Sequence, residues 1–214
     1  MIPKFLKPLA RHFYPYYLRL IHTPPPETEG LTLYPRFVLP SDVVIEVGAR
    51  IGGGTLLLSN LAKHVYSFEP NPSSFHFLKA FTKKKSNVTI FQCGYGAENG
   101  EALLNLLEND KLSNLASIKN RKDVKFTRKE KIKIIKLDDF EFDLKPTTLI
   151  IDCEAFEIEV LKGAEKILNE IKKVLVEIHH TPDRTPTLQT VISELEDYNI
   201  NTKVCPGWVV ATKQ

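Results

Sequence analysis

The sequence is poor in cysteine and contains no long apolar run. Its three cysteines are odd in number and lie far apart, at Cys93, Cys153 and Cys205. This spacing argues against a disulfide framework and a zinc-type centre, and it fits a reducing compartment. No apolar run approaches the roughly 20 residues that a membrane-spanning helix needs, and the first residues lack the pattern of a secretory signal. We therefore expect a cytoplasmic protein without a transmembrane segment.

A large excess of one charge is also missing. The chain has 29 Lys and Arg against 26 Asp and Glu, a net charge of +3, so its composition does not demand nucleic acid as a partner. Its 214 residues suit one α/β domain, at residues 41–214, with an appendage at residues 1–40. In the appendage, a basic, aromatic segment of helical period precedes a run of prolines. We interpret it as a packing helix, a lid over the ligand pocket, or a surface that touches membrane or RNA.

The domain alternates between short apolar runs and longer amphipathic segments. The apolar runs predict strands at 43–47, 65–69, 88–92, 148–152 and 173–178. The amphipathic segments predict helices at 54–63, 72–84, 156–170 and 186–198. Because near-continuous apolar strands are typical of a parallel sheet covered on both faces, we predict an α/β, Rossmann-like fold with helices on both faces.

The end of the sequence departs from this alternation. Residues 201–205 and 208–212 have the pattern of two strands joined by a tight turn, which predicts an antiparallel hairpin at the end of a mostly parallel, seven-stranded sheet. Residues 101–137 also break the rhythm. We expect an inserted hairpin there, over the carboxyl ends of the sheet, where ligands bind in open α/β folds. The many lysines between 111 and 133 indicate a solvated face or, as the alternative, a phosphate-binding surface.

A glycine turn after the first strand is the strongest signal of a ligand site. Glu46 lies in that strand, Gly48 and Gly52 form the turn, and a helix starts near Thr55. The glycines permit a sharp turn and a close approach of the backbone to a ligand, and the helix directs its N–H groups at a carboxylate or phosphate. Arg50 stands where a dinucleotide fingerprint needs glycine, which disfavours a bound pyrophosphate. Glu46 favours a ligand with ammonium and sulfonium charge.

An acidic residue closes the next strand. Glu69 follows Gly48 by 21 positions and precedes Pro70, which stiffens the exit from the strand. A glycine turn with an acid about 20 residues later is typical of an α/β sheet that binds the ribose of a nucleoside. We therefore expect Glu69 to accept hydrogen bonds from both ribose hydroxyls, while Asn71 caps the following helix.

Further acids and a histidine follow the later strands. Asp152, Glu154 and Glu157 cluster after one buried strand. Their alternative roles are to orient a second substrate, to take its proton, or to hold a divalent cation. His179 emerges after the next strand and is interpreted as a general base with an ordinary pKa near 6.5, or as a structural histidine. No ligand spacing compels a metal site, and none is predicted.

These segments resemble the FkbM family of S-adenosylmethionine-dependent methyltransferases over roughly residues 43–180. The family's first motif, Asp-x-Gly-Ala-Asn-x-Gly-x-x-Thr, is similar to residues 46–55, and its acidic strand end is similar to residues 68–72. Its adenine segment, Asn-x-Ala-Leu-Gly, matches residues 92–96 loosely. Its late motif, Lys-Ile-Asp-Val-Glu-Gly-x-Glu followed by Val-Leu-x-Gly-Ala, is similar to residues 150–164.

The resemblance implies a class I methyltransferase domain with S-adenosyl-L-methionine as its cofactor. The candidate catalytic residues are Asp152, Glu154 and His179. The candidate cofactor-binding residues are Glu46, Gly48, Ala49, Arg50, Gly52, Thr55, Glu69, Pro70, Gln92, Cys93, Gly94 and Asp152. The sequence departs from the family pattern at Arg50 in the glycine turn, at Ile150 in place of lysine, and at Ala155 in place of glycine.

We therefore predict methyl transfer to a hydroxyl group of a sugar, a lipid-linked glycan or a small natural product, as the resemblance implies. The expected partner is thus a small-molecule or glycan acceptor. One alternative is an RNA methyltransferase that uses the basic insertion. A second alternative, suggested by Ile150 and Ala155, is a cofactor-binding subunit that has lost catalysis.

Overall fold

The computed structural model describes residues 29–107, 118, 126–179, 187–196, 198, 200–205 and 207–213. The chain divides into two compact units, residues 1–37 and 38–214. In the first unit, the described part is helix α2 (Glu29–Phe37), which contains Pro35 and lies where a linker is expected. The helix expected before residue 24 lies outside the described residues. Within the described ranges, no helix has the length and apolar content needed to cross a membrane.

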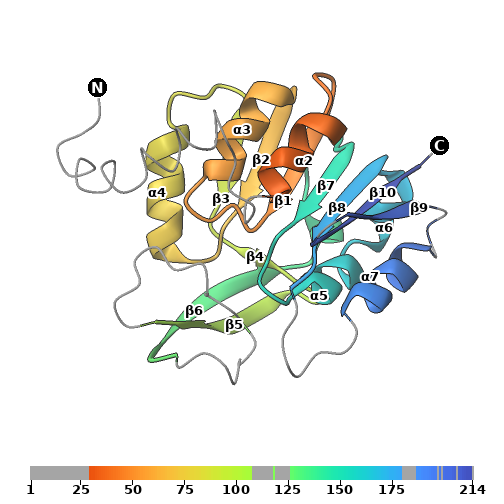
Figure 1. Ribbon diagram of the computed structural model, residues 1–214. Helices are drawn as coiled ribbons and strands as arrows, with labels where there is room; N and C mark the ends of the chain where they lie inside the picture. The colour runs from red at the N-terminus through yellow and green to blue at the C-terminus, as the bar shows by residue number, and fades with distance from the viewer. Residues whose placement is uncertain are drawn as a thin grey trace. The chain divides into compact units, whose positions relative to one another are not determined.

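The second unit is built on a seven-stranded sheet of order β3-β2-β1-β7-β8-β10-β9 (Figure 1). Its strands are β1 (Val43–Val47), β2 (His64–Phe68), β3 (Val88–Phe91), β7 (Thr148–Ile151), β8 (Lys173–Glu177), β9 (Asn201–Cys205) and β10 (Trp208–Thr212). The first five are parallel, whereas β10 runs antiparallel to both β8 and β9. The predicted Rossmann-like sheet with a terminal antiparallel hairpin is therefore confirmed.

The strand order reverses direction between β1 and β7, and this reversal positions the helices. Helices α3 (Gly53–Leu61) and α4 (Pro72–Thr82) connect the strands that run from β1 toward β3. The helices on the other arm are α5 (Glu157–Lys162), α6 (Glu165–Glu170) and α7 (Thr187–Glu196). Because parallel crossovers are right-handed, the two groups cover opposite faces of the sheet. The carboxyl ends of β1 and β7 thus flank the switch point where α/β folds bind ligands.

The single helix expected over residues 156–170 is wrong, since α5 and α6 are separate helices. A Cβ on Gly163, between them, would lie 2.0 Å from the carbonyl oxygen of Gly96, so the backbone passes another segment too closely for a side chain. The short 3-10 helix η2 (Leu137–Asp139) explains why a second helix, α6, starts after Gly163. The Asp138 carboxylate accepts hydrogen bonds from the backbone N–H groups of Lys166 (2.9 Å) and Ile167 (3.0 Å) in the first turn of α6.

A three-stranded sheet of order β4-β6-β5 accompanies the large one. Strands β5 (Gly100–Leu106) and β6 (Arg128–Ile135) form an antiparallel hairpin, and the short strand β4 (Gly94–Tyr95) pairs in parallel with β6. Only two residues separate β3 from β4, so the small sheet begins at the carboxyl end of β3. The sequence pattern does not predict β4.

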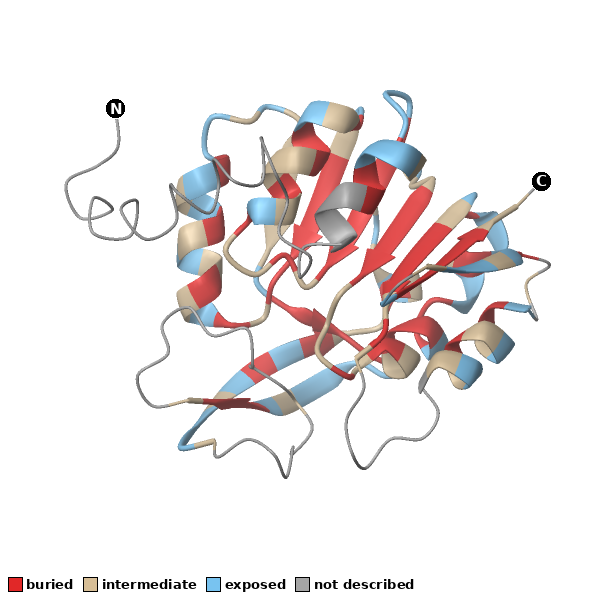
Figure 2. Cartoon of the chain, in the orientation of Figure 1, coloured by how far each residue is buried: buried red, intermediate tan, exposed pale blue. Residues whose placement is uncertain are grey.

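Burial follows the position of each strand in the large sheet (Figure 2). All five residues of β1 and all four of β7 are buried, whereas the edge strands β3 and β9 contain no fully buried residue. Helices on both faces account for this difference, because they exclude water from the central strands. The buried centre of the sheet therefore holds the carboxyl ends of β1 and β7.

Candidate active site

The glycine turn after β1 is pressed between two neighbouring strands. The backbone N–H groups of Gly48 and Ala49 both donate to the Phe68 carbonyl oxygen, each at 3.0 Å. Gly48 has a φ of +92°, and a Cβ at this residue would lie 1.7 Å from the carbonyl oxygen of Asp152. Glycine is required here both for the left-handed conformation and for the close approach of β7.

Gly52 closes the same turn at the start of α3. Its N–H donates to the Ala49 carbonyl at 2.9 Å, and its φ is +96°. A Cβ there would lie 2.9 Å from Cδ1 of Leu78 on α4. Arg50, between the two glycines, has a φ of +53° and places its charge near Glu69 and Asp152, where it lowers the pKa of both carboxyls against the opposing effect of burial. The turn therefore combines a tight backbone with one cation.

Glu69 is fixed by two backbone donors. Its Oε2 accepts a hydrogen bond from the Arg50 N–H and its Oε1 from the Asn71 N–H, both at 2.8 Å. The side chain is 7% exposed, and burial raises its pKa to about 7. Each carboxylate oxygen can accept more than one hydrogen bond. Glu69 is thus positioned by the chain and retains acceptor capacity for two hydroxyl groups.

Glu46 lies beneath the turn. Its Oε2 accepts hydrogen bonds from Oγ1 of Thr55 (2.5 Å) and Oγ of Ser67 (2.7 Å). Burial raises the pKa of Glu46 to about 7. The structure therefore places Glu46 and Thr55, both expected to contact the cofactor, in an internal network that ties α3 to β1 and β2.

The candidates for the adenine side meet at the ends of β2 and β3. Gln92 is exposed directly after β3, and Cys93 is buried. A Cβ on Gly94 would lie 3.6 Å from Cβ of Pro70, so the two segments are in contact. Asn71 accepts the Ser73 N–H at 3.0 Å and caps α4, as expected. The structure brings these residues to the same edge as Glu69.

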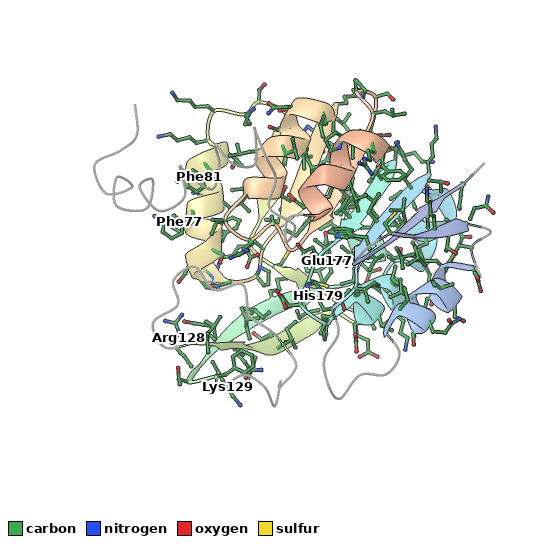
Figure 3. The ribbon with its side chains drawn as sticks, in the orientation of Figure 1. Phe77, Phe81, Arg128, Lys129, Glu177 and His179 are labelled. Carbon is green, nitrogen blue, oxygen red and sulfur yellow. The ribbon has the colours of Figure 1, made fainter. Side chains whose placement is uncertain are left out.

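A second group of side chains gathers where β7 and β8 end, and Glu177 and His179 belong to it (Figure 3). Nδ1 of His179 lies 2.7 Å from Oε1 of Glu157. Its Nε2 lies 3.6 Å from Asp152 Oδ1, 3.8 Å from Glu154 Oε1 and 3.9 Å from Glu177 Oε2. The three candidate catalytic residues therefore converge. Two further acids, Glu157 and Glu177, which are not among the candidates, lie beside them.

The acids make His179 a cation. Burial lowers its pKa, but the hydrogen bond to Glu157 and the charges of Asp152 and Glu154 outweigh burial and raise the pKa to about 9. The imidazole is therefore protonated near neutral pH in this state. This differs from the neutral base with an ordinary pKa that the sequence suggests.

Glu177 and Asp152 form a hydrogen-bonded carboxyl pair. Burial, followed by the charge of Asp152, raises the pKa of Glu177 to about 8, and burial also raises the pKa of Asp152. Two adjacent carboxyls with raised pKa values hold a proton between them. Sequence reasoning misses Glu177, although its position at the end of a buried strand, like that of Asp152, is a usable signal.

The turn that carries Glu154 has an uncommon backbone. Glu154 and Ala155 have φ values of +50° and +77°, in the left-handed region that favours glycine. The Ala155 N–H donates to Oε1 of Glu157 at 2.8 Å, and Glu157 is completely buried. Ala155 therefore occupies a glycine-like conformation despite its Cβ. Ile150, the other departure, is fully buried in β7.

This fold defines a class of protein. A parallel sheet with a glycine turn at its switch point, a ribose-type acid on the next strand and a terminal antiparallel hairpin is the architecture of class I methyltransferases. The family model of the methyltransferase FkbM domain matches residues 46–200, and the chain belongs to this family.

Individual relatives agree with this assignment. The chain is 30% identical over 141 residues to the hexuronic acid methyltransferase AglP of Haloferax volcanii, a match that covers 64% of this chain and 56% of that enzyme. Its fold is similar to that of the methyltransferase FkbM from Methylobacillus flagellatus, with a TM-score of 0.54, 18% identity and coverage of 97% of this chain and 60% of that one. A structure from Streptococcus mutans in complex with SAH gives a TM-score of 0.54 at 11% identity, covering 89% and 98% of the two chains. This chain spans less than two thirds of the length of the first two relatives.

Proposed function

We propose that this protein transfers a methyl group from S-adenosylmethionine to a hydroxyl group of a sugar, with acidic sugars such as hexuronic acids as the first acceptors to test. The observation that carries the proposal is the fixed Glu69 carboxylate beside the Gly48 turn, at the switch point of the sheet. The relative that acts on hexuronic acid supports the choice of acceptor.

The residues present fit this cofactor. Glu69 has acceptor capacity for both ribose hydroxyls, and the Gly48 turn offers close backbone approach for the methionine end. Gln92 and Cys93 lie at the edge expected to border the adenine. When bound, S-adenosylmethionine supplies an electrophilic methyl group.

The side chains at the ends of β7 and β8 then bind and deprotonate the acceptor. Methyl transfer is an in-line displacement, so orientation of the acceptor oxygen supplies much of the rate. The hydroxyl must also lose its proton, and the surrounding carboxyls are the acceptors at hand: Glu154 and the Asp152–Glu177 pair. In the unliganded site, the protonated His179 balances their negative charge.

The RNA alternative remains a prediction. Two of the cations in the described part of the insertion already have acidic neighbours: Lys131 pairs with Glu101, and Arg128 lies 3.3 Å from Glu130. These pairs reduce the charge available for phosphate contacts.

The test is incubation with methyl-labelled S-adenosylmethionine and separate acceptors: hexuronic acid glycosides, neutral sugars, lipid-linked glycans and RNA. We expect label in a sugar fraction. Mild alkali hydrolyses a methyl ester but leaves a methyl ether, so alkali-stable label marks a hydroxyl acceptor. Label that alkali removes would overturn the hydroxyl assignment, and label found in RNA alone would overturn the sugar assignment. No transfer to any acceptor, despite cofactor binding, would favour a subunit without catalysis.

A further inference from the structure

Asp152, Glu177 and His179 lie close enough to share one ligand. One potential ligand atom from each residue lies within 4.8 Å of the others. The residues come from the ends of two adjacent parallel strands, and Figure 3 shows Glu177 and His179 next to each other where β8 ends. All three side chains are partly exposed, so an ion from solvent can reach them.

The histidine is held in the orientation that a metal ligand needs. The completely buried Glu157 binds Nδ1 of His179 at 2.7 Å, which leaves Nε2 facing Asp152 and Glu177. A carboxylate on the far nitrogen is the usual support of a metal-binding histidine, because it fixes the tautomer and the ring orientation. Sequence spacing does not reveal this support.

The excess of carboxyl groups at this site also favours the binding of a cation. Asp152, Glu154, Glu157 and Glu177 surround a single imidazole. The second oxygen of Glu157 is buried and has no hydrogen-bond partner among the described residues. Uncompensated buried carboxylate charge is costly, and a divalent ion is often the largest charge that balances such a group.

We propose that Asp152, Glu177 and His179 bind one divalent cation, Mg²⁺ or Mn²⁺, which holds the acceptor through two adjacent oxygens. The two carboxylates supply the oxygen ligands that these ions prefer. The imidazole adds a nitrogen ligand once ion binding has displaced its proton, and a set of three ligands leaves coordination positions open. A sugar with neighbouring hydroxyls, or with a hydroxyl beside a carboxylate, fills such positions. An anionic sugar would otherwise meet several carboxylates of its own sign.

This part of the inference rests on the proposed function. The cation polarises the coordinated hydroxyl and lowers its pKa. Glu154, which is not among the three ligands, takes the hydroxyl proton. The oxygen forms a bond to the methyl carbon while the bond from that carbon to sulfur breaks, which releases S-adenosylhomocysteine.

The test uses the full chain after chelator treatment, with Mn²⁺ as the probe. Electron paramagnetic resonance measures free Mn²⁺ as protein is added, and we expect one site per chain. Glu177→Gln and His179→Gln should each weaken binding at least tenfold, whereas Glu98→Gln, which changes an exposed acid, should not. Calorimetry with S-adenosylhomocysteine confirms that each variant is folded.

The outcomes separate the two proposals. Wild-type protein that binds no Mn²⁺, or folded Glu177→Gln and His179→Gln variants that bind it like the wild type, would overturn the cation site whatever the activity. Methyl transfer at an unchanged rate in chelator would overturn the role of the cation and leave the proposed function intact. A confirmed Mn²⁺ site without transfer to any acceptor would instead overturn the proposed function.

Discussion

The two halves of the site satisfy their acids in different ways. On the β1–β2 side, Glu46 and Glu69 accept hydrogen bonds from hydroxyl and N–H groups within residues 50–71. On the β7–β8 side, Asp152 and Glu177 face each other and a protonated imidazole. The first half is organised by hydrogen-bond donors of the chain itself, whereas we expect the second half to be completed by the ligand that it binds. We therefore expect changes in the first half to alter cofactor binding, and changes in the second to alter cation and acceptor binding.

The largest effect should come from Gly48→Ala. The added Cβ would meet the Asp152 carbonyl at 1.7 Å and the residue would keep a φ of +92°, so β1 and β7 must separate. We expect a loss of more than about 3 kcal/mol in the free energy of unfolding, measured by urea denaturation.

Gly53→Ala is the matched control. No atom lies within 4 Å of a Cβ at Gly53, at the start of α3, and its stability should stay within about 0.5 kcal/mol of wild type. Equal stability of the two variants would show that the turn is not packed against β7.

Asp42→Asn should destabilise the amino ends of the central strands, away from the site, without changing cofactor affinity. Asp42 pairs with Lys173 and accepts hydrogen bonds from the Leu39 N–H (2.7 Å) and the Thr147 hydroxyl (3.0 Å). Breaking such a buried pair should cost about 2 kcal/mol at pH 7.

The pH dependence of this effect has a defined sign. Burial raises the pKa of Asp42, but the Lys173 hydrogen bond and the other donors bring it below its ordinary value of 3.8. The stabilisation is thus complete above pH 3.8 and is lost as pH falls through the lower folded-state pKa. Urea denaturation at pH 7 and pH 3 should show the difference between wild type and variant shrinking. A constant difference would contradict the ionic account.

Cofactor affinity should depend on the ionisation of Glu69. Its pKa of about 7, raised by burial, means that part of the population is protonated at neutral pH. Ribose hydroxyls favour the carboxylate, so the affinity for S-adenosylhomocysteine should fall about fivefold from pH 7 to pH 6 and level off above pH 8. In the free protein, the stabilisation from protonated Glu69 is present below pH 4.5 and lost as pH rises through about 7. Calorimetric titration across this range checks the affinity, and a flat profile would contradict the role of Glu69.

The smallest effect is expected for Ala155→Gly. A residue with a φ of +77° is relieved by removal of its Cβ, so the variant should gain about 1 kcal/mol in stability. Thermal denaturation measures the gain. Ala164→Gly, outside the left-handed region, should instead lose stability because it removes a fully buried methyl group. Destabilisation of both variants would contradict the strained turn.

Much of the fold is predictable from the sequence because its cause is local. The strands β1, β9 and β10 end at turn residues, and their expected bounds match the structure. The break between α5 and α6 is not predictable, because it depends on the contact of Gly163 with Gly96, which is far away in sequence. Helix α2 is missed since Pro35 disfavours a helix.

Among the site residues, too, those with a local cause are predictable from the sequence and the others are not. Gly48 and Glu69 are recognisable because their spacing follows from the distance between two adjacent strands. The support of His179 by Glu157 joins different elements through a side chain, and sequence spacing gives no measure of it. The pKa of His179 is also missed, since it depends on the acids at 152–157, which the fold brings to the end of β8.

The most direct test of the account is calorimetric titration of wild type and Glu69→Gln with S-adenosylmethionine, S-adenosylhomocysteine and NAD. The wild type should bind the first two and not NAD. Glu69→Gln should lose about 100-fold in affinity, because two hydrogen bonds to a charged group are weakened, while the exposed Glu98→Gln control should bind like the wild type. Binding of NAD alone, or unchanged affinity in Glu69→Gln, would contradict the assignment of the β1–β2 half as the cofactor site.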